Sequence, residues 1–226
     1  MRNRAAFLLL PFFALPALSP AAEKPRASRP AIISAPERSD AQKTAQQLHD
    51  EGLKAFKAGN FEAAKLTFGK VLAISPGNAA ALINLALVEQ RARHYEAAEK
   101  YLRSLLRENP ANATAWLLLG IGASEQDHIE AAHAHLAQAV LYAPEDARAH
   151  QYLGIALWRR GWHSAGEDEL RRALEINPKY ADAHYNLANL YLHRTPAPIE
   201  LARRHYQKAV ELGAAPDEKL AKQLGN

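Results

Sequence analysis

Prolines recur along this chain at one fixed interval, and that interval restricts the folds that the chain can adopt. Four successive prolines are equally spaced, namely Pro76, Pro110, Pro144 and Pro178. Small residues keep the same period in three further columns: Ala45, Ala79, Ala113, Ala147 and Ala181; Ala64, Ala98 and Ala132, with Gly166 next; and Gly52, Gly120 and Gly154, with Ala86 and Ala188 in the remaining two units. A constant period of about 34 residues indicates stacked copies of one supersecondary unit.

Each unit is predicted to be a pair of helices. In the third unit, residues 113–126 and 129–142 carry apolar residues at helical spacing, and a short polar turn separates them. The proline ends the second helix because it lacks a backbone N–H and clashes with the preceding turn. Gly154 and Gly166 put glycine on both helices of the fourth unit, at a cost of about 1 kcal/mol each in helix propensity. An especially close helix crossing is therefore predicted there.

These units resemble the tetratricopeptide repeat family, whose motif is W-x2-L-G-x2-Y, then A-x3-F, then P. The third unit carries Trp116, Leu119, Gly120, Ala132, Leu136 and Pro144, and the first carries Gly52, Phe61, Ala64, Phe68 and Pro76. The resemblance implies an all-α, right-handed α-solenoid of five helix pairs plus a short C-terminal capping helix. The repeats would be 45–78, 79–112, 113–146, 147–180 and 181–216, with the capping helix at 217–226. Unit five needs two extra residues to bring Ala202 and Tyr206 into register.

The N-terminal segment has the three parts of a secretory signal peptide. A basic "MRNR" precedes an apolar stretch, Ala5 to Leu18, and "SPAA" supplies small residues for cleavage, so residues 1–22 are predicted to be removed. The apolar stretch is shorter than the roughly 20 residues that a membrane-spanning helix needs. We therefore expect an exported protein without an integral span after cleavage, periplasmic in a Gram-negative source and secreted otherwise. The alternative is a disordered apolar tail on a cytosolic protein.

Residues 23–40 are predicted to be a disordered linker before the solenoid at 41–226. This stretch holds Pro25, Pro30 and Pro36 among mixed charges and has no helical period. Helical pattern begins near Ser39, which can form a capping box with Gln42.

Charge and composition exclude several classes of function. From residue 45 onward, basic and acidic residues are equally numerous, so no basic face for nucleic acid is expected. The chain has no cysteine, which excludes disulfides and thiolate metal sites. It also lacks H-E-x-x-H, G-x-S-x-G, phosphate-binding and EF-hand motifs. We predict no catalytic residue, cofactor or metal site, and hence no enzyme.

Histidines need separate consideration because they could bind a metal. His128, His133 and His135 are spaced by five and two residues, whereas metal-binding pairs on a helix are three or four apart. His150 and His184 occupy the repeat position of Trp116. We predict that these two residues pack between helices.

The family resemblance places binding on the concave face, which the first helix of every unit builds. One subclass binds a terminal carboxylate with Lys, Asn and Arg; here only Asn84 fits, and Leu118 stands where a cation is needed. What remains is an apolar strip with charged edges, which marks an interaction surface. The alternative is that tight curvature makes these residues bury one another. The predicted groove comprises Phe56, Ile83, Asn84, Leu87, Leu117, Ile121, Arg148, Tyr152, Ile155, Trp158, Tyr185 and Asn189.

Three functions fit this prediction. The first is an exported interaction module or scaffold that binds an apolar or amphipathic peptide segment of a partner protein. The second is a glycan-binding envelope or polysaccharide-export accessory protein, in which Tyr152, Trp158 and Tyr185 stack on sugar rings. The third is a self-associating assembly scaffold, a homo-oligomer in which residues 29–36 occupy the groove of a neighbouring copy.

Overall fold

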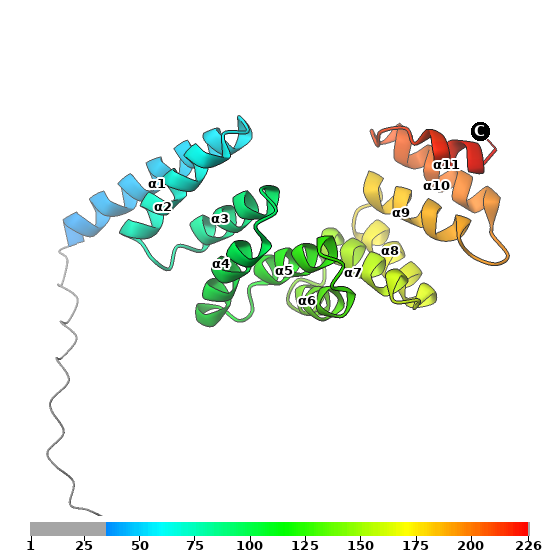
Figure 1. Cartoon of the computed structure of the whole chain (residues 1–226), viewed down its shortest axis with the longest axis horizontal. Helices are drawn as coiled ribbons and strands as arrows, with labels where there is room; N and C mark the ends of the chain where they lie inside the picture. Colours follow the sequence, from blue (N-terminus) through cyan, green and yellow to red (C-terminus); the bar gives the residue numbers. More distant parts are fainter. Residues whose placement is uncertain (1–34, 226) are drawn as a thin grey trace, which may run out of the picture.

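The computed structural model describes residues 35–225, and its regular structure is helical throughout that range. Successive helices pair within each unit, and the units follow one another along a curved path from α1 to α11 (Figure 1). None of the helices in this described part is long and apolar enough to span a membrane. The helices are α1 (Ala35–Lys57), α2 (Phe61–Ile74), α3 (Ala79–Arg91), α4 (Tyr95–Glu108), α5 (Ala113–Glu125), α6 (Ile129–Tyr142), α7 (Ala147–Arg159), α8 (His163–Ile176), α9 (Ala181–Leu192), α10 (Ile199–Glu211) and α11 (Glu218–Gln223).

The first helix α1 begins earlier than the sequence pattern predicts. The structure has helix from Ala35, so the predicted linker boundary at residue 40 is displaced, and Ser39 lies inside the helix instead of capping it. Pro36 is compatible with this start, because the first turn of a helix has no use for the missing N–H. The predicted signal peptide and the rest of the linker lie outside the described residues.

Short polar side chains set the start of several helices. Asn60, Asn78 and Asn112 each accept a hydrogen bond from the backbone N–H three residues later, at 2.9–3.1 Å. Such caps satisfy one of the amides that a helix N-terminus leaves without a partner. In the turns at Pro76 and Pro110, one helix therefore ends and the next begins within a few residues.

The fourth unit contains the predicted close crossing. A Cβ atom placed on Gly154 would lie 2.8 Å from the carbonyl oxygen of Gly166, and one on Gly166 would lie 2.7 Å from that of Gly154. In the first unit the same position on α1, Gly52, faces the ring of Phe68. Only in the fourth unit, among the glycines described, do two glycines face each other's backbone. The backbones of α7 and α8 are thus in direct contact.

Tight turns between the paired helices use a left-handed residue at one repeat position. That position holds Gly59, Arg93, Asp127 and Gly161, with φ of 75°, 60°, 62° and 85°. Glycine adopts this conformation without the steric cost that a Cβ imposes.

Replacing Arg93 with glycine is expected to stabilise the protein by about 0.5 kcal/mol, because relief of the left-handed strain exceeds the entropy that glycine adds to the unfolded chain. Gly161→Ala makes the opposite change and should destabilise the protein by about 1 kcal/mol. Urea titrations followed by circular dichroism would measure both, and shifts of the same sign would contradict this explanation.

The C-terminal helix covers the end of the solenoid as predicted. Leu220 and Leu224 on and after α11 are 2% and 0% exposed, and they pack against the last helix pair. The Tyr206 hydroxyl donates to the Asp217 carbonyl oxygen at 3.0 Å and accepts from the Asp217 N–H at 2.9 Å. The terminal apolar face is therefore closed by the chain itself.

Candidate interaction groove

Helices α3, α5 and α7 together form a concave pocket of about 480 Å³. Apolar side chains from all three helices line it together with polar and charged ones. Six residues of the predicted groove meet here: Ile83, Leu87, Leu117, Ile121, Arg148 and Tyr152. Gln90, Arg91, Thr114, Leu118 and Glu125 complete the lining. The repeat geometry thus brings side chains from three successive units into one site.

A second, smaller pocket of about 140 Å³ lies further along the same row of first helices. Ile155, Trp158 and Asn189, all in the predicted groove, line it together with Asn186, Leu170 and Leu190. Helix α7 lines both pockets, and Tyr152 of the first precedes Ile155 of the second by about one turn. A bound segment could therefore place one apolar side chain in each.

Three residues of the predicted groove line neither pocket. Phe56 packs edge-on against Phe61, with ring centroids 5.5 Å apart. The Asn84 amide nitrogen lies 2.9 Å from His49 Nε2, and the Tyr185 hydroxyl donates to Asp217 Oδ2 at 2.7 Å. Because their polar groups already have partners, Asn84 and Tyr185 support the fold at the two ends of the groove.

Leu117 and Leu118 are more buried than an exposed strip requires. They are 3% and 7% exposed, because the neighbouring units pack against α5 on both sides. Leu117 therefore exposes much less of its side chain than predicted. It lies at the floor of the pocket. Ile121 and Tyr152 remain half-buried and form its accessible wall.

Two side chains of α7, Arg148 and Tyr152, give the larger pocket hydrogen-bonding groups. Arg148 donates from Nε and Nη2 to the two carboxylate oxygens of Asp146, at 3.1 and 2.8 Å, and this hydrogen bonding raises the pKa of Arg148. Burial, followed by the charges of Asp182 and Glu125, raises the pKa of Tyr152. The Tyr152 hydroxyl therefore remains protonated at neutral pH and can donate to a ligand.

Leu170 is not among the predicted groove residues, because the family resemblance places the groove on the first helices. Leu170 lies on α8, and it reaches the smaller pocket past Gly154, whose missing side chain opens the way. The signal was present in the sequence as a leucine on the second helix facing a glycine on the first. The sequence alone does not show that Leu170 and Gly154 face each other, so the structure is needed to recognise this contact.

The histidines take structural positions. His150 is 6% exposed; its Nε2 lies 2.9 Å from the Pro144 carbonyl oxygen and its Nδ1 lies 2.6 Å from Glu169 Oε2. His184 Nε2 lies 3.1 Å from the carbonyl oxygen of Pro178, and its Nδ1 lies 2.9 Å from Nδ1 of His205 on α10. Inter-helix packing is confirmed for both residues. Within residues 35–225, no three acidic or histidine side chains are grouped as a metal site would need.

Stacked helix pairs with a concave apolar groove define a helical-repeat scaffold. A model of the tetratricopeptide repeat matches residues 55–119 and 89–154, and a second TPR model matches residues 168–193. The chain therefore belongs to the tetratricopeptide repeat family, which mediates protein–protein interaction. A comparison with curated proteins returned no match.

Solved structures show the same fold. PilF of Pseudomonas aeruginosa is 24% identical with a TM-score of 0.72, over 81% of this chain and 85% of PilF. A thermophilic TPR protein of Thermus thermophilus is 22% identical with a TM-score of 0.65, over 80% of this chain and 97% of that one. YrrB, described as a TPR protein with an unusual peptide-binding site, is 21% identical with a TM-score of 0.59, over 83% and 94%.

Proposed function

We propose that this protein is a non-catalytic scaffold whose concave groove binds an extended or amphipathic segment of a partner polypeptide. The observation that carries the proposal is the pair of pockets along the first helices, both of which are lined by α7, through Tyr152 in one and Ile155 in the other. Their apolar walls provide burial, at about 25 cal/mol per Å² removed from water. The peptide-binding site described for YrrB, which shares the fold, agrees with a role of this kind.

Polar groups beside the apolar walls suit a polypeptide. Asn186 and Asn189 stand next to Trp158 in the smaller pocket, and an amide side chain can both donate to and accept from a peptide bond. Arg91 and Glu125 lie at the rim of the larger pocket with opposite charges. A segment with two apolar side chains and mixed charge between them would match this arrangement.

Glycan binding has less support than peptide binding. The predicted glycan site would gather three aromatic faces, whereas Tyr152 and Trp158 line different pockets and Tyr185 lines neither. Trp158 also packs against His193, with ring centroids 5.8 Å apart. Export through residues 1–22, and self-association through residues 29–36, remain parts of the proposal that deletion of each segment would test.

Selection of peptides on the immobilised protein tests the proposal without knowledge of the natural partner. Dodecamer peptides enriched from a random library should carry two apolar side chains a few residues apart. On binding, backbone amides of α3, α5, α7 and α9 should gain protection from hydrogen exchange. Protection confined to the second helices α4, α6 and α8 would contradict the assignment of the groove.

A further inference from the structure

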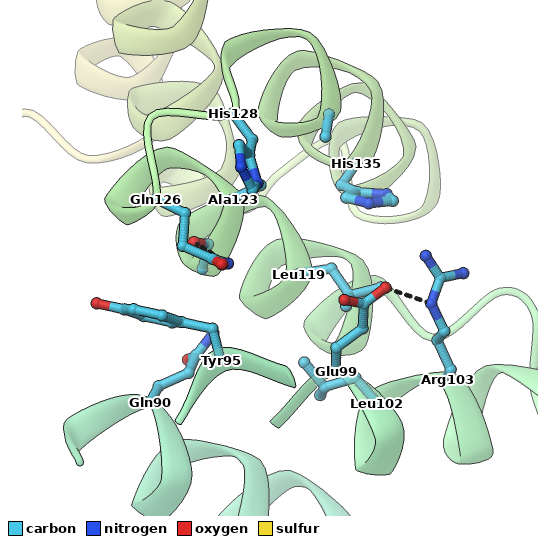
Figure 2. A pocket seen from close by; sticks show the side chains of 12 residues that line it. Gln90, Tyr95, Glu99, Leu102, Arg103, Leu119, Ala123, Gln126, His128 and His135 are labelled. Atoms are coloured by element: carbon cyan, nitrogen blue, oxygen red, sulfur yellow. Dashed lines mark hydrogen bonds and ion pairs between the residues drawn. The ribbon is translucent and has the colours of Figure 1, made fainter. Parts of the chain in front are cut away.

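A crevice of about 220 Å³ lies between the second and third units, distinct from the concave groove. Tyr95 and Glu99 of α4 line one side, and His128 and His135 line the other (Figure 2). Gln90 is shared with the concave pocket, where its amide donates to the Leu118 carbonyl oxygen at 2.7 Å. Among the described residues, Gln90 is the one that lines both the crevice and the concave pocket.

The crevice exists because one repeat position holds a small residue in unit three. That position, on the first helix, carries Glu89, Ala123, Leu157 and Tyr191 in units two to five. Where the side chain is large, it fills the space beside the preceding unit, with Glu89, Leu157 and Tyr191 at 2%, 6% and 1% exposed. Ala123 is too short to do so, and with Gly122 it leaves the floor of the crevice open.

The interface between units four and five shows what such a space can contain. The Tyr191 hydroxyl donates to Glu167 Oε1 at 3.0 Å and accepts from Arg171 Nη2 at 3.2 Å. The Tyr191 ring lies against His205, with centroids 5.6 Å apart. Burial raises the pKa of Tyr191, so its hydroxyl remains a donor at neutral pH. Three side chains therefore hold one phenol.

The same three side chains line the crevice. Glu99 and Arg103 occupy the repeat positions of Glu167 and Arg171 two units earlier, and His135 corresponds to His205 once the two extra residues of unit five are counted. In the crevice Arg103 Nε donates to Glu99, and no residue of the described chain occupies the place of the phenol. The Glu99 side chain is 44% exposed, whereas that of Glu167 is 11% exposed.

The contacts that hold His135 in place also have counterparts around His205 in unit five. His135 stacks on Trp116 at 5.6 Å, as His205 packs on His184 at 5.1 Å. Trp116 Nε1 donates to the Pro110 carbonyl oxygen at 2.8 Å, the counterpart of the contact between His184 and Pro178. Burial and then Arg103 lower the pKa of His135, so its ring is neutral at pH 7. The crevice is thereby preorganised.

We propose that this crevice binds a phenolic ring, the side chain of a tyrosine from a partner polypeptide. Its hydroxyl donates to Glu99 and accepts from Arg103, and its ring packs against His135, as Tyr191 does two units later. The space suffices, because a cavity of about 150 Å³ can bind benzene. This inference does not rest on the groove proposed above.

Calorimetric titration of p-cresol, the tyrosine side chain as a free molecule, into the full-length protein tests the inference. One p-cresol should bind per chain, and toluene should bind at least tenfold more weakly, because it leaves the Glu99 and Arg103 groups without the hydroxyl. Ala123→Tyr fills the crevice from within and should abolish binding. Ala134→Tyr, at an exposed position of α6, is the matched control and should bind p-cresol like the wild type.

Two further measurements keep the test decisive. If Ala123→Tyr does not fold, Ala123→Leu copies Leu157 and should also abolish binding. The peptide acetyl-Gly-Tyr-Gly-amide should displace p-cresol; failure to do so would overturn a polypeptide as the source of the ring. Absence of p-cresol binding, equal affinity for toluene, or undiminished binding by the filled variant would each overturn the site.

Discussion

Gly166→Ala is expected to destabilise the protein by about 2 kcal/mol, although alanine is the better helix former. The added methyl group would lie 2.7 Å from the Gly154 carbonyl oxygen and 3.0 Å from the Trp158 backbone nitrogen. Backbone atoms of a packed helix cannot turn aside as a flexible side chain can, so α7 and α8 must separate. Overpacking of this kind typically costs about 1–3 kcal/mol and outweighs the gain of about 1 kcal/mol in helix propensity.

Gly69 supplies the matched control for this substitution. It also lies within a second helix, α2, but apart from its chain neighbours and the backbone of α2 itself no described atom stands within 4 Å of the position that its Cβ would take. Gly69→Ala should therefore stabilise the protein by up to about 1 kcal/mol. Urea titrations of both variants, followed by far-ultraviolet circular dichroism, give the comparison. Equal stabilities for Gly166→Ala and the wild type would show that the crossing can widen without cost.

Acidification is expected to remove about 2 kcal/mol of stability through His205. Burial, with the nearby His184 and Arg171 adding to it, lowers the pKa of His205 from 6.5 to about 4. Because its pKa is lower in the folded state, the unfolded chain binds the proton first. The stabilising contribution is complete above pH 6.5 and is lost as the pH falls towards 4. A tenfold change in proton affinity is worth about 1.4 kcal/mol, so the full shift would correspond to about 3 kcal/mol, which solvent screening reduces.

The surroundings of His205 account for its lowered pKa. Its ring packs against Tyr191 and His184, with ring centroids 5.6 and 5.1 Å apart. His205 Nδ1 lies 2.9 Å from His184 Nδ1, so a charge on His205 would lie directly beside a second titratable ring. Stability measured between pH 7.5 and 4 should fall less steeply for His205→Gln than for the wild type. Parallel curves for the two proteins would contradict the assignment.

The sequence was sufficient for the repeat register and insufficient for the depth of the groove. An unbroken period determines which residues are equivalent, so the close crossing at Gly154 and Gly166 and the closing leucines Leu220 and Leu224 could be predicted. The burial of Leu117 depends on how closely α3 and α7 approach α5. Curvature arises from small rotations between units, which no single-sequence pattern encodes.

The sequence pattern does not predict the start of α1, for a local reason. Prolines are typical of a linker, whereas Pro36 occupies a first helical turn, where proline is tolerated. The crevice at Ala123 can be predicted from the sequence only in part. Its repeat column is visible in the sequence, but the meaning of a small residue there depends on seeing Tyr191 among Glu167, Arg171 and His205.

The affinity of a library-selected peptide for matched variants tests the central claim, the binding of a polypeptide in the groove, most directly. Ile121→Asp places a charge on the accessible wall of the larger pocket, whereas Leu66→Asp and Leu141→Asp place the same charge on second helices, at side chains 69% and 65% exposed. Circular dichroism would confirm that all three variants keep their helices. We expect Ile121→Asp to weaken peptide binding about 30-fold, the loss typical of an interface hot spot of about 2 kcal/mol, and the two controls to bind like the wild type. Unchanged affinity of Ile121→Asp, or equal losses in all three variants, would contradict it.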